Sequence, residues 1–135
     1  MSKEDDNQNY KTIEFQGKAA ARAFKSLPLE LQLSFMQQLD RVSYGKDPTI
    51  KIEHLAESVG PGAIELKENG SPAYRCVYYN KEPGKVWVLH AFVKTTNQSD
   101  QKNLATAKGR LKALKATLKK GKPKAGKKKQ EKDKS

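Results

Sequence analysis

The hydrophobic period of the chain changes at Gly62, and this change limits the folds that the sequence can form. Between residues 18 and 44, apolar residues recur at the three- and four-residue spacing of amphipathic helices. After Gly62 they alternate every second residue, as in half-buried strands. A chain of 135 residues can form one domain with a substantial core but is short for two. The sequence therefore predicts one α+β domain, with helices before most of the sheet.

Two helices packed as a hairpin are predicted between residues 18 and 44. The first contains KAAARAF, and Pro28 then suits the first turn of the second. A short strand, YKTIEF, is predicted before them at residues 10–15. Turn-forming Gly and Pro in YGKDPT and SVGPG end this part of the chain. The predicted apolar face of the second helix consists of Leu29, Leu33, Met36, Leu39 and Val42.

Three strands in an antiparallel meander are predicted after Gly62. AIELKENG, AYRCVYYN and KVWVLHAFV are separated by NGSP and KEPG, which are rich in turn formers. A last helix follows, with Ser99 or Asp100 as the predicted N-cap. We expect its apolar stripe to pack on the sheet or on a partner. The stripe consists of Leu104, Ala107, Leu111, Leu114 and Leu118.

The formal charge of +12 is unevenly distributed along the chain. Residues 1–100 contain equal numbers of basic and acidic side chains, so the whole excess lies in residues 101–135. We expect residues 1–9 to be a disordered N-terminus, residues 10–118 to form the domain, and residues 119–135 to be a disordered lysine-rich tail. Such a tail raises the affinity for any polyanion without sequence preference.

Several classes of protein are disfavoured by the composition. One cysteine, Cys76, forms no internal disulfide, and two histidines without ligand spacing predict neither a metal site nor a cofactor. We expect Cys76 to be buried and inert. The sequence contains no apolar run of membrane-spanning length and no secretory signal pattern. We therefore expect a cytoplasmic protein with no membrane partner.

Residues 54–114 carry a set of motifs in a defined order. Glu-Leu-Lys stands at 65–67, Tyr-Arg at 74–75, Leu-His-Ala-Phe-Val-Lys-Thr at 89–95, and Ala-Lys-Gly-Arg at 107–110. In these motifs the chain resembles the RelE/ParE toxin superfamily, and most closely its phage-type HigB-like branch. It departs from the branch pattern twice, because Lys67 replaces the usual arginine and Thr95 replaces a second lysine.

The resemblance implies a RelE-like fold and the toxin of a type II toxin–antitoxin pair. Such a toxin is usually a metal-independent endoribonuclease that cleaves mRNA on the translating ribosome, and its partner is a helix-turn-helix antitoxin. The ParE line of the superfamily instead inhibits DNA gyrase. A third reading is a non-enzymatic protein that keeps the fold and binds nucleic acid or the ribosome. Fold similarity does not decide among these activities.

Cleaving RNA without a metal requires three tasks at one phosphate. The 2′-hydroxyl must lose a proton, the developing charge must be stabilised, and the leaving 5′-oxygen must gain a proton. Arg75 suits the second task because its guanidinium is always charged and forked. Strand alternation places Arg75 with Val77, and Lys94 with Phe92, so a cation cluster forms if those faces coincide.

The other candidate catalytic residues are Lys67 and His90, and each candidate also has a structural reading. Lys67 serves as a cation or a general base, or forms an ion pair with Glu65 or Glu68. Arg75 can pair with Glu65 across the sheet. His90 has the right pKa for acid or base work but lies in a strand that favours half-burial. A lysine at a strand end, such as Lys94, is ordinarily solvated.

Further residues are candidates for nucleic-acid binding or for the core. Tyr79 can stack on a base. Arg110 faces either the same cleft or the solvent. Trp87 is predicted to be core, on the opposite strand face from His90 and Phe92, and His54 is predicted to be a loop residue without a role. The predicted basic face of the last helix, which binds RNA or is solvated, consists of Lys108, Lys112, Lys115 and Lys119.

Overall fold

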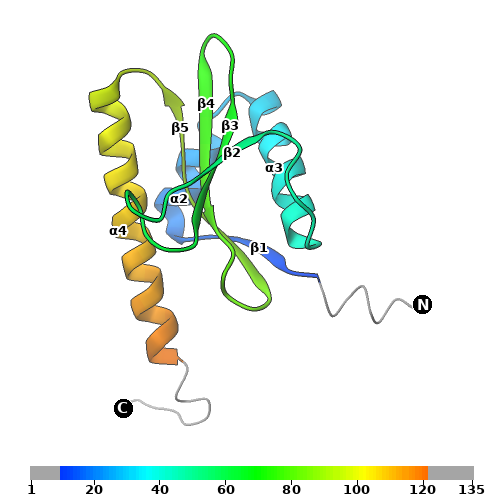
Figure 1. The fold of residues 1–135 in the computed structure, drawn as a ribbon, viewed down its shortest axis with the longest axis vertical. Coiled ribbons are helices and arrows are strands. Elements are labelled where there is room, and N and C mark those ends of the chain that lie inside the picture. The colour runs from blue at the N-terminus through cyan, green and yellow to red at the C-terminus, as the bar shows by residue number, and fades with distance from the viewer. Residues whose placement is uncertain (1–9, 122–135) are drawn as a thin grey trace, which may run out of the picture.

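The computed structural model of the protein describes residues 10–121. Over these residues a five-stranded sheet lies between α4 on one side and α2 and α3 on the other (Figure 1). This confirms the predicted α+β class. The elements in chain order are β1 (Thr12–Phe15), α2 (Gly17–Lys25), α3 (Leu29–Ser43), β2 (Lys51–His54), β3 (Ala63–Glu68), β4 (Ala73–Tyr79), β5 (Lys85–Lys94) and α4 (Asn97–Gly121).

The strands are ordered β1-β5-β4-β3-β2 in the sheet. The pairs β3–β4 and β4–β5 are antiparallel, which confirms the predicted meander. The predicted first strand also forms, and β1 pairs in parallel with β5. Its pairing extends only from Lys85 to Val88, so within residues 10–121 no strand pairs with the second half of β5 on that side.

One strand was not predicted. β2 pairs antiparallel with β3 and forms an edge of the sheet. All four of its residues are exposed, so no alternation between buried and exposed positions marks it in the sequence. The prediction that His54 lies in a loop is wrong, because His54 is the last residue of β2 and pairs with Ile64.

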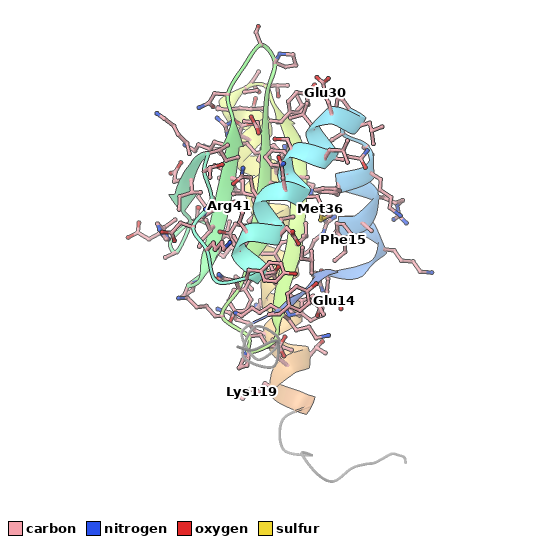
Figure 2. The ribbon with its side chains drawn as sticks, turned by 90° about the vertical axis from the view of Figure 1, so that its right-hand side faces the viewer. Glu14, Phe15, Glu30, Met36, Arg41 and Lys119 are labelled. Atoms are coloured by element: carbon pink, nitrogen blue, oxygen red, sulfur yellow. The ribbon has the colours of Figure 1, made fainter. Side chains whose placement is uncertain are left out.

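The helical hairpin covers one face of the sheet. Figure 2 views α3 from this side, with Glu30 near its start and Arg41 near its end, while α4 runs behind the sheet towards Lys119. The predicted apolar face of α3 is partly wrong, since Leu29 and Leu33 are 67% and 62% exposed. Phe35, with Leu39 and Val42, defines the buried face instead. At about 100° per residue, Leu33 lies roughly 200° around the helix from Phe35.

The apolar cluster on this face joins the helices to the inward side chains of three strands. Phe24 and Phe35 from the hairpin pack with Leu66, Cys76 and Val88 of the sheet, among others. Cys76 is fully buried, as predicted, and burial raises the pKa of its thiol, so the thiolate is disfavoured. This face of the sheet is therefore closed mainly by apolar side chains.

The apolar stripe of α4 packs on the opposite face, as predicted. Ala107, Leu111 and Leu114 are buried against Val77, Leu89 and Phe92, and Leu104 and Leu118 are partly buried at the two ends of the stripe. The contact between α4 and the sheet fixes the register of the helix on β5. Side chains near the start of α4 are thereby placed against the ends of β3, β4 and β5.

Both predicted ends of the last helix are corrected. The Asp100 backbone N–H donates to the Thr96 carbonyl oxygen at 2.9 Å, so α4 starts at Asn97, ahead of the predicted caps. At its other end α4 continues through Gly121, three residues beyond the predicted domain boundary. The predicted disordered segments at 1–9 and 122–135 lie outside the described residues.

A register shift in the sheet changes which residues share a face. Val77 pairs with His90, but the next residue, Tyr78, pairs with Val88, so Leu89 is an extra residue in β5. Trp87 therefore packs with the same cluster as Phe92. The prediction that these two residues lie on opposite faces is wrong, because simple alternation does not include a bulge.

Candidate active site

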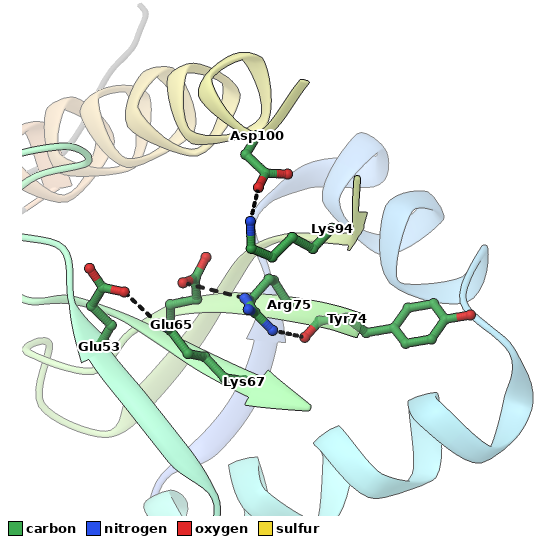
Figure 3. Close-up of polar contacts among 7 residues, drawn as sticks. All are labelled: Glu53, Glu65, Lys67, Tyr74, Arg75, Lys94 and Asp100. Carbon is green, nitrogen blue, oxygen red and sulfur yellow. Dashed lines mark hydrogen bonds and ion pairs between the residues drawn. The ribbon is translucent and has the colours of Figure 1, made fainter. Parts of the chain in front are cut away.

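A small cleft lies where α4 begins, on the face of the sheet that α4 covers. Its volume is about 160 Å³, and β2, β3, β4, β5 and α4 all contribute to it. We call it the ionic cleft, because six of its lining side chains are charged, and Figure 3 shows them. The lining residues are Glu53, Glu65, Lys67, Arg75, Phe92, Lys94, Asp100 and Leu104.

The strand register brings three of the predicted catalytic residues together. Lys67 is directly opposite Arg75, and Arg75 is directly opposite Phe92, so their side chains share one face of the sheet. Lys94 lies two residues after Phe92 and returns to the same face. The faces of Arg75 and Lys94 therefore coincide, and Lys67, Arg75 and Lys94 all line the ionic cleft.

Each cation of the cleft faces a carboxylate. Lys67 Nζ lies 2.7 Å from Glu53 Oε1, and Arg75 Nε lies 3.8 Å from Glu65 Oε1. Lys94 Nζ donates to Asp100 Oδ2 at 2.6 Å (Figure 3). The Arg75–Glu65 pair is the one that the structural reading of the sequence anticipated. The partner of Lys67 is Glu53, from the strand that was not predicted, rather than Glu65 or Glu68.

Arg75 is held in place from two directions. The residue is 6% exposed, and its Nη1 donates to the Tyr74 carbonyl oxygen at 3.0 Å. This bond and the Glu65 contact orient the plane of the guanidinium in the cleft (Figure 3). A forked donor fixed in this way is prepared to bind two oxygens of one anionic group.

Glu65 was predicted only as an ion-pair partner, either of Arg75 or of Lys67. It is 6% exposed. Burial raises its pKa above the ordinary value of 4.5, while the positive charges of Arg75 and Lys67 act in the opposite direction. The negative charges of Glu53 and Asp100 raise the pKa further. A buried carboxylate with a raised pKa is a stronger base than an exposed one.

Asp100 is the second acid that the sequence analysis assigned to another task. It was considered as a helix cap, but its side chain turns into the cleft and its Oδ2 accepts from Lys94. Its other oxygen, Oδ1, is buried and accepts no hydrogen bond from the residues that the structure describes. A buried acceptor without a donor is unfavourable, so Oδ1 is available to a donor that a bound molecule supplies.

His90 and Arg110 form a separate cluster between β5 and α4. Arg110 Nη1 donates to the Leu89 carbonyl oxygen and to His90 Nδ1, each at 3.0 Å. Since Nδ1 accepts, Nε2 carries the proton and donates to Asn103 Oδ1 at 2.7 Å. Burial lowers the pKa of His90, the bond to Asn103 opposes this, and Arg110 lowers the pKa further. Neither His90 nor Arg110 lines the ionic cleft.

The other predicted nucleic-acid contacts lie elsewhere on the domain. Tyr79 ends β4 at the end opposite the cleft, and Lys115 Nζ lies 5.3 Å from the centroid of its ring. Lys115 Nζ also donates to the Pro61 carbonyl oxygen at 3.2 Å. Lys108, Lys112 and Lys119 are exposed on the outer face of α4. These positions suit general attraction to a polyanion more than contact with a reacting phosphate.

Two features of other protein classes are absent from residues 10–121. These residues contain no group of three or more His, Cys, Asp or Glu side chains that is arranged to hold a metal ion. In the same part of the chain, no helix has both the length and the apolar character that crossing a bilayer requires.

Comparison with known proteins identifies the family. Residues 22–112 match the family described as Phage derived protein Gp49-like. The match covers more than half of the chain and all of the residues that line the ionic cleft. No curated protein and no solved structure matches the chain. The chain therefore belongs to the phage-derived Gp49-like family, a family of RelE-like toxins associated with toxin–antitoxin systems.

Proposed function

We propose that the protein is the toxin of a type II toxin–antitoxin pair and acts as a metal-independent endoribonuclease that cleaves mRNA on the ribosome. Its branch of the superfamily is the HigB-like one, and its partner is a helix-turn-helix antitoxin. One observation carries the proposal: three cations and a buried carboxylate with a raised pKa line the same cleft. Phosphodiester cleavage without a metal needs this combination of groups.

In the first step one side chain acts as the general base and two cations bind the phosphate. Glu65 takes the proton of the ribose 2′-hydroxyl, whose oxygen then attacks the phosphorus. Arg75 and Lys67 stabilise the negative charge that develops on the phosphate oxygens. Asp100 Oδ1, which has no hydrogen-bond donor among the described residues, accepts from a ribose hydroxyl and favours RNA over DNA.

The second step releases the 5′-oxygen. The bond from phosphorus to this oxygen breaks as Lys94 donates a proton to it, which leaves a 2′,3′-cyclic phosphate and a free 5′-hydroxyl. Lys94 then regains a proton and Glu65 loses one to solvent, so the protein returns to its starting charge. Asp100, 2.6 Å from the Lys94 Nζ, orients that group before the step.

A non-enzymatic protein that binds nucleic acid or the ribosome is the second candidate. The observation that favours it is the charge balance of the ionic cleft, where each cation already has a carboxylate partner. A phosphate must displace at least part of this pairing before it can bind. Under this reading the basic face of α4 and residues 122–135 would supply the affinity, and the cleft would be structural.

The deciding experiment incubates purified protein with programmed ribosomes and mRNA. Primer extension should find cuts within the coding sequence, and the 3′ ends should carry cyclic phosphate. Binding without cuts would support the second candidate. Intact transcripts together with linearised DNA in a gyrase assay would favour a toxin of the ParE type.

A matched pair of variants locates the activity. Replacing Lys67, Arg75 and Lys94 together by alanine should abolish cleavage while ribosome binding persists. The control replaces Arg22, Lys46 and Lys81 by alanine, which removes the same charge from exposed positions outside the cleft. Equal loss of activity in both proteins would show that only the net charge matters.

A further inference from the structure

A second cavity adjoins the ionic cleft and has no part in the proposed chemistry. Its volume is about 470 Å³, against about 160 Å³ for the cleft, which places it in the size range of ligand-binding pockets. It lies between the end of α2, the second half of β5 and α4, and its walls include Leu27, Tyr74 and Ala91. We call it the edge cavity.

The edge cavity and the ionic cleft share a wall. Phe92 lines both of them. In addition, β4, β5 and α4 each contribute two residues that are adjacent in sequence, of which one lines the edge cavity and the other lines the ionic cleft. The two sites are therefore separated by little more than the width of a strand. The pairs, with the edge-cavity residue first, are Tyr74 and Arg75 on β4, Val93 and Lys94 on β5, and Asn103 and Leu104 on α4.

The sheet leaves room for this cavity because β1 is short. β1 pairs with β5 only from Lys85 to Val88. Past Val88, no strand of the described part of the chain covers the edge of β5, and the residues Ala91, Val93 and Thr95 line the cavity along that edge. A molecule that lies in the edge cavity therefore contacts the end of the strand that presents Lys94 to the cleft.

The two sites have opposite chemistry. Six charged side chains line the ionic cleft, whereas none of the residues that line the edge cavity is charged. The edge cavity combines apolar walls at Leu27, Ala91 and Phe92 with polar groups from Ser26, Thr95 and Asn103. The charged lining of the ionic cleft suits a phosphate. A nucleobase, which has apolar faces and polar edges, suits the lining of the edge cavity.

One polar group of the edge cavity is held in a fixed orientation. Asn103 Oδ1 lies 2.7 Å from His90 Nε2, and His90 Nδ1 in turn accepts from Arg110. Arg110 therefore holds the ring of His90, and His90 in turn holds the carboxamide of Asn103. A positioned carboxamide can discriminate among bases by the pattern of donors and acceptors on their edges.

We propose that the edge cavity binds the base of the nucleotide next to the cleaved phosphate and thereby sets the sequence preference of cleavage. This inference rests on the proposed function, since it needs the phosphate to occupy the ionic cleft. The base packs between Phe92 and Leu27, and Asn103 contacts its edge. Cleavage then depends on which base fits.

The first test uses NMR titration of the full-length protein with the four nucleoside 5′-monophosphates and with ribose 5-phosphate. All five ligands should shift the signals of the ionic cleft. Only ligands with a base should shift the amide signals of Ala23, Ser26 and Leu27, which line the edge cavity and have no neighbour in the ionic cleft, and the four bases should differ. If ribose 5-phosphate shifts the same cavity signals, the cavity does not bind the base and the inference is overturned.

The second test fills the cavity. Ala23→Leu places a larger side chain on a residue of α2 that lines the edge cavity, and Ala19→Leu is the same change at an exposed position one turn earlier. Ala23→Leu should weaken the base-dependent binding by about 5-fold to 150-fold, the range for losing one stacked base. Its cut sites on mRNA should also lose base preference, while Ala19→Leu should match the wild type.

The two tests separate failure of this inference from failure of the proposed function. If no ligand shifts the cleft and the wild type makes no cuts, the proposed function fails. If the wild type cuts but Ala23→Leu, folded by circular dichroism, keeps the same binding and cut sites, the edge cavity has no role in recognition. Should Ala23→Leu not fold, Val93→Trp, at a residue that is 38% exposed, replaces it under the same criteria.

Discussion

The two faces of the sheet are closed in different ways. Under α2 and α3 the buried side chains form an apolar cluster, and the buried polar residues of α3, Gln38 and Ser43, are neutral. The face under α4 is apolar where Leu111 and Leu114 pack, but it ends in the ionic cleft. Glu65, Arg75 and His90 are all buried on this second face.

This difference separates stability from chemistry. Apolar burial stabilises the fold by roughly 25 cal/mol per Å² and needs no partner of defined geometry. Buried charges give little net stability, because each must lose its water, and a buried pair is expensive to break on one side. We therefore expect substitutions on the α2 and α3 face to change unfolding, and substitutions in the ionic cleft to change cleavage.

The largest expected effect is on cleavage, from Glu65→Gln. If Glu65 is the general base, the amide should lower the cleavage rate by about 10²- to 10⁴-fold. In the wild type the rate should fall about tenfold per pH unit below the raised pKa of Glu65, because only the carboxylate accepts the proton. Single-turnover cleavage as a function of pH measures both.

Stability should depend on Glu65 in the opposite direction. A carboxyl group whose pKa is raised in the folded protein stabilises the fold below its unfolded pKa, and that contribution is lost as the pH rises through the folded pKa. Chemical denaturation of the wild type and Glu65→Gln over the same pH range would show this. A Glu65→Gln protein with the wild-type rate and pH profile would exclude Glu65 as the base.

Phe35→Ala tests the apolar face. Phe35 is fully buried under α3, and removing its ring should lower the free energy of unfolding by about 3–5 kcal/mol. Cleavage per folded molecule should remain close to the wild-type value. Leu33→Ala, on the exposed side of the same helix, is the control and should change stability by less than about 0.5 kcal/mol.

Arg75→Ala tests whether the ionic cleft acts in chemistry. Loss of one preorganised charge-stabilising donor should reduce cleavage by about 10²- to 10³-fold. Arg75→Lys should recover only part of this, because an ammonium group lacks the bidentate fork. Cleavage and thermal unfolding measured on the same samples separate chemistry from folding. If Arg75→Ala is stable and fully active, Arg75 belongs to the structure alone.

His90 should make stability depend weakly on pH. Burial lowers its pKa in the folded protein, so its contribution to stability is present above the ordinary pKa of 6.5 and is lost as the pH falls below that value. The slope for one proton cannot exceed about 1.4 kcal/mol per pH unit. Urea unfolding between pH 5 and pH 8, spanning roughly the range where histidine titrates, should show this slope in the wild type.

His90→Gln should flatten that slope, and His54→Gln, at the exposed end of β2, is the control for loss of an imidazole. The prediction is contradicted if His90→Gln retains the wild-type slope. The measurement also tests the difference between the two faces of the sheet. It shows whether a buried ionisable group under α4 lowers the free energy of unfolding in acid.

The smallest expected effect is that of ending the chain after Lys120. Stability should change by less than about 0.5 kcal/mol, because the removed residues have no apolar periodicity with which to form a core. The salt dependence of RNA binding should become shallower, since each phosphate contact contributes a slope of about 0.7 for single strands. A large loss of melting temperature would show that these residues pack on the domain.

The sequence alone predicted much of the fold because the relevant signals are local. Apolar spacing gave the helical hairpin and α4, and the turns NGSP and KEPG gave the meander. Prediction from the sequence failed where no local signal exists. β2 is exposed along its whole length, and its pairing with β3 is decided by the sheet rather than by its own residues. The prediction of the apolar face of α3 was partly wrong because burial of Phe35, rather than the number of leucines, orients the helix.

For the site, alternation placed Arg75 and Lys94 each on a strand face, but only the tertiary structure brought those faces and Lys67 together. It also decided the partners. Glu53 reaches Lys67 from an unpredicted strand, Glu65 acquires a raised pKa by burial, and Asp100 turns from the start of α4 into the cleft. A sequence determines what a side chain can do chemically. Which charges face it, and how much water they keep, depends on contacts between distant segments and is settled only when the chain packs.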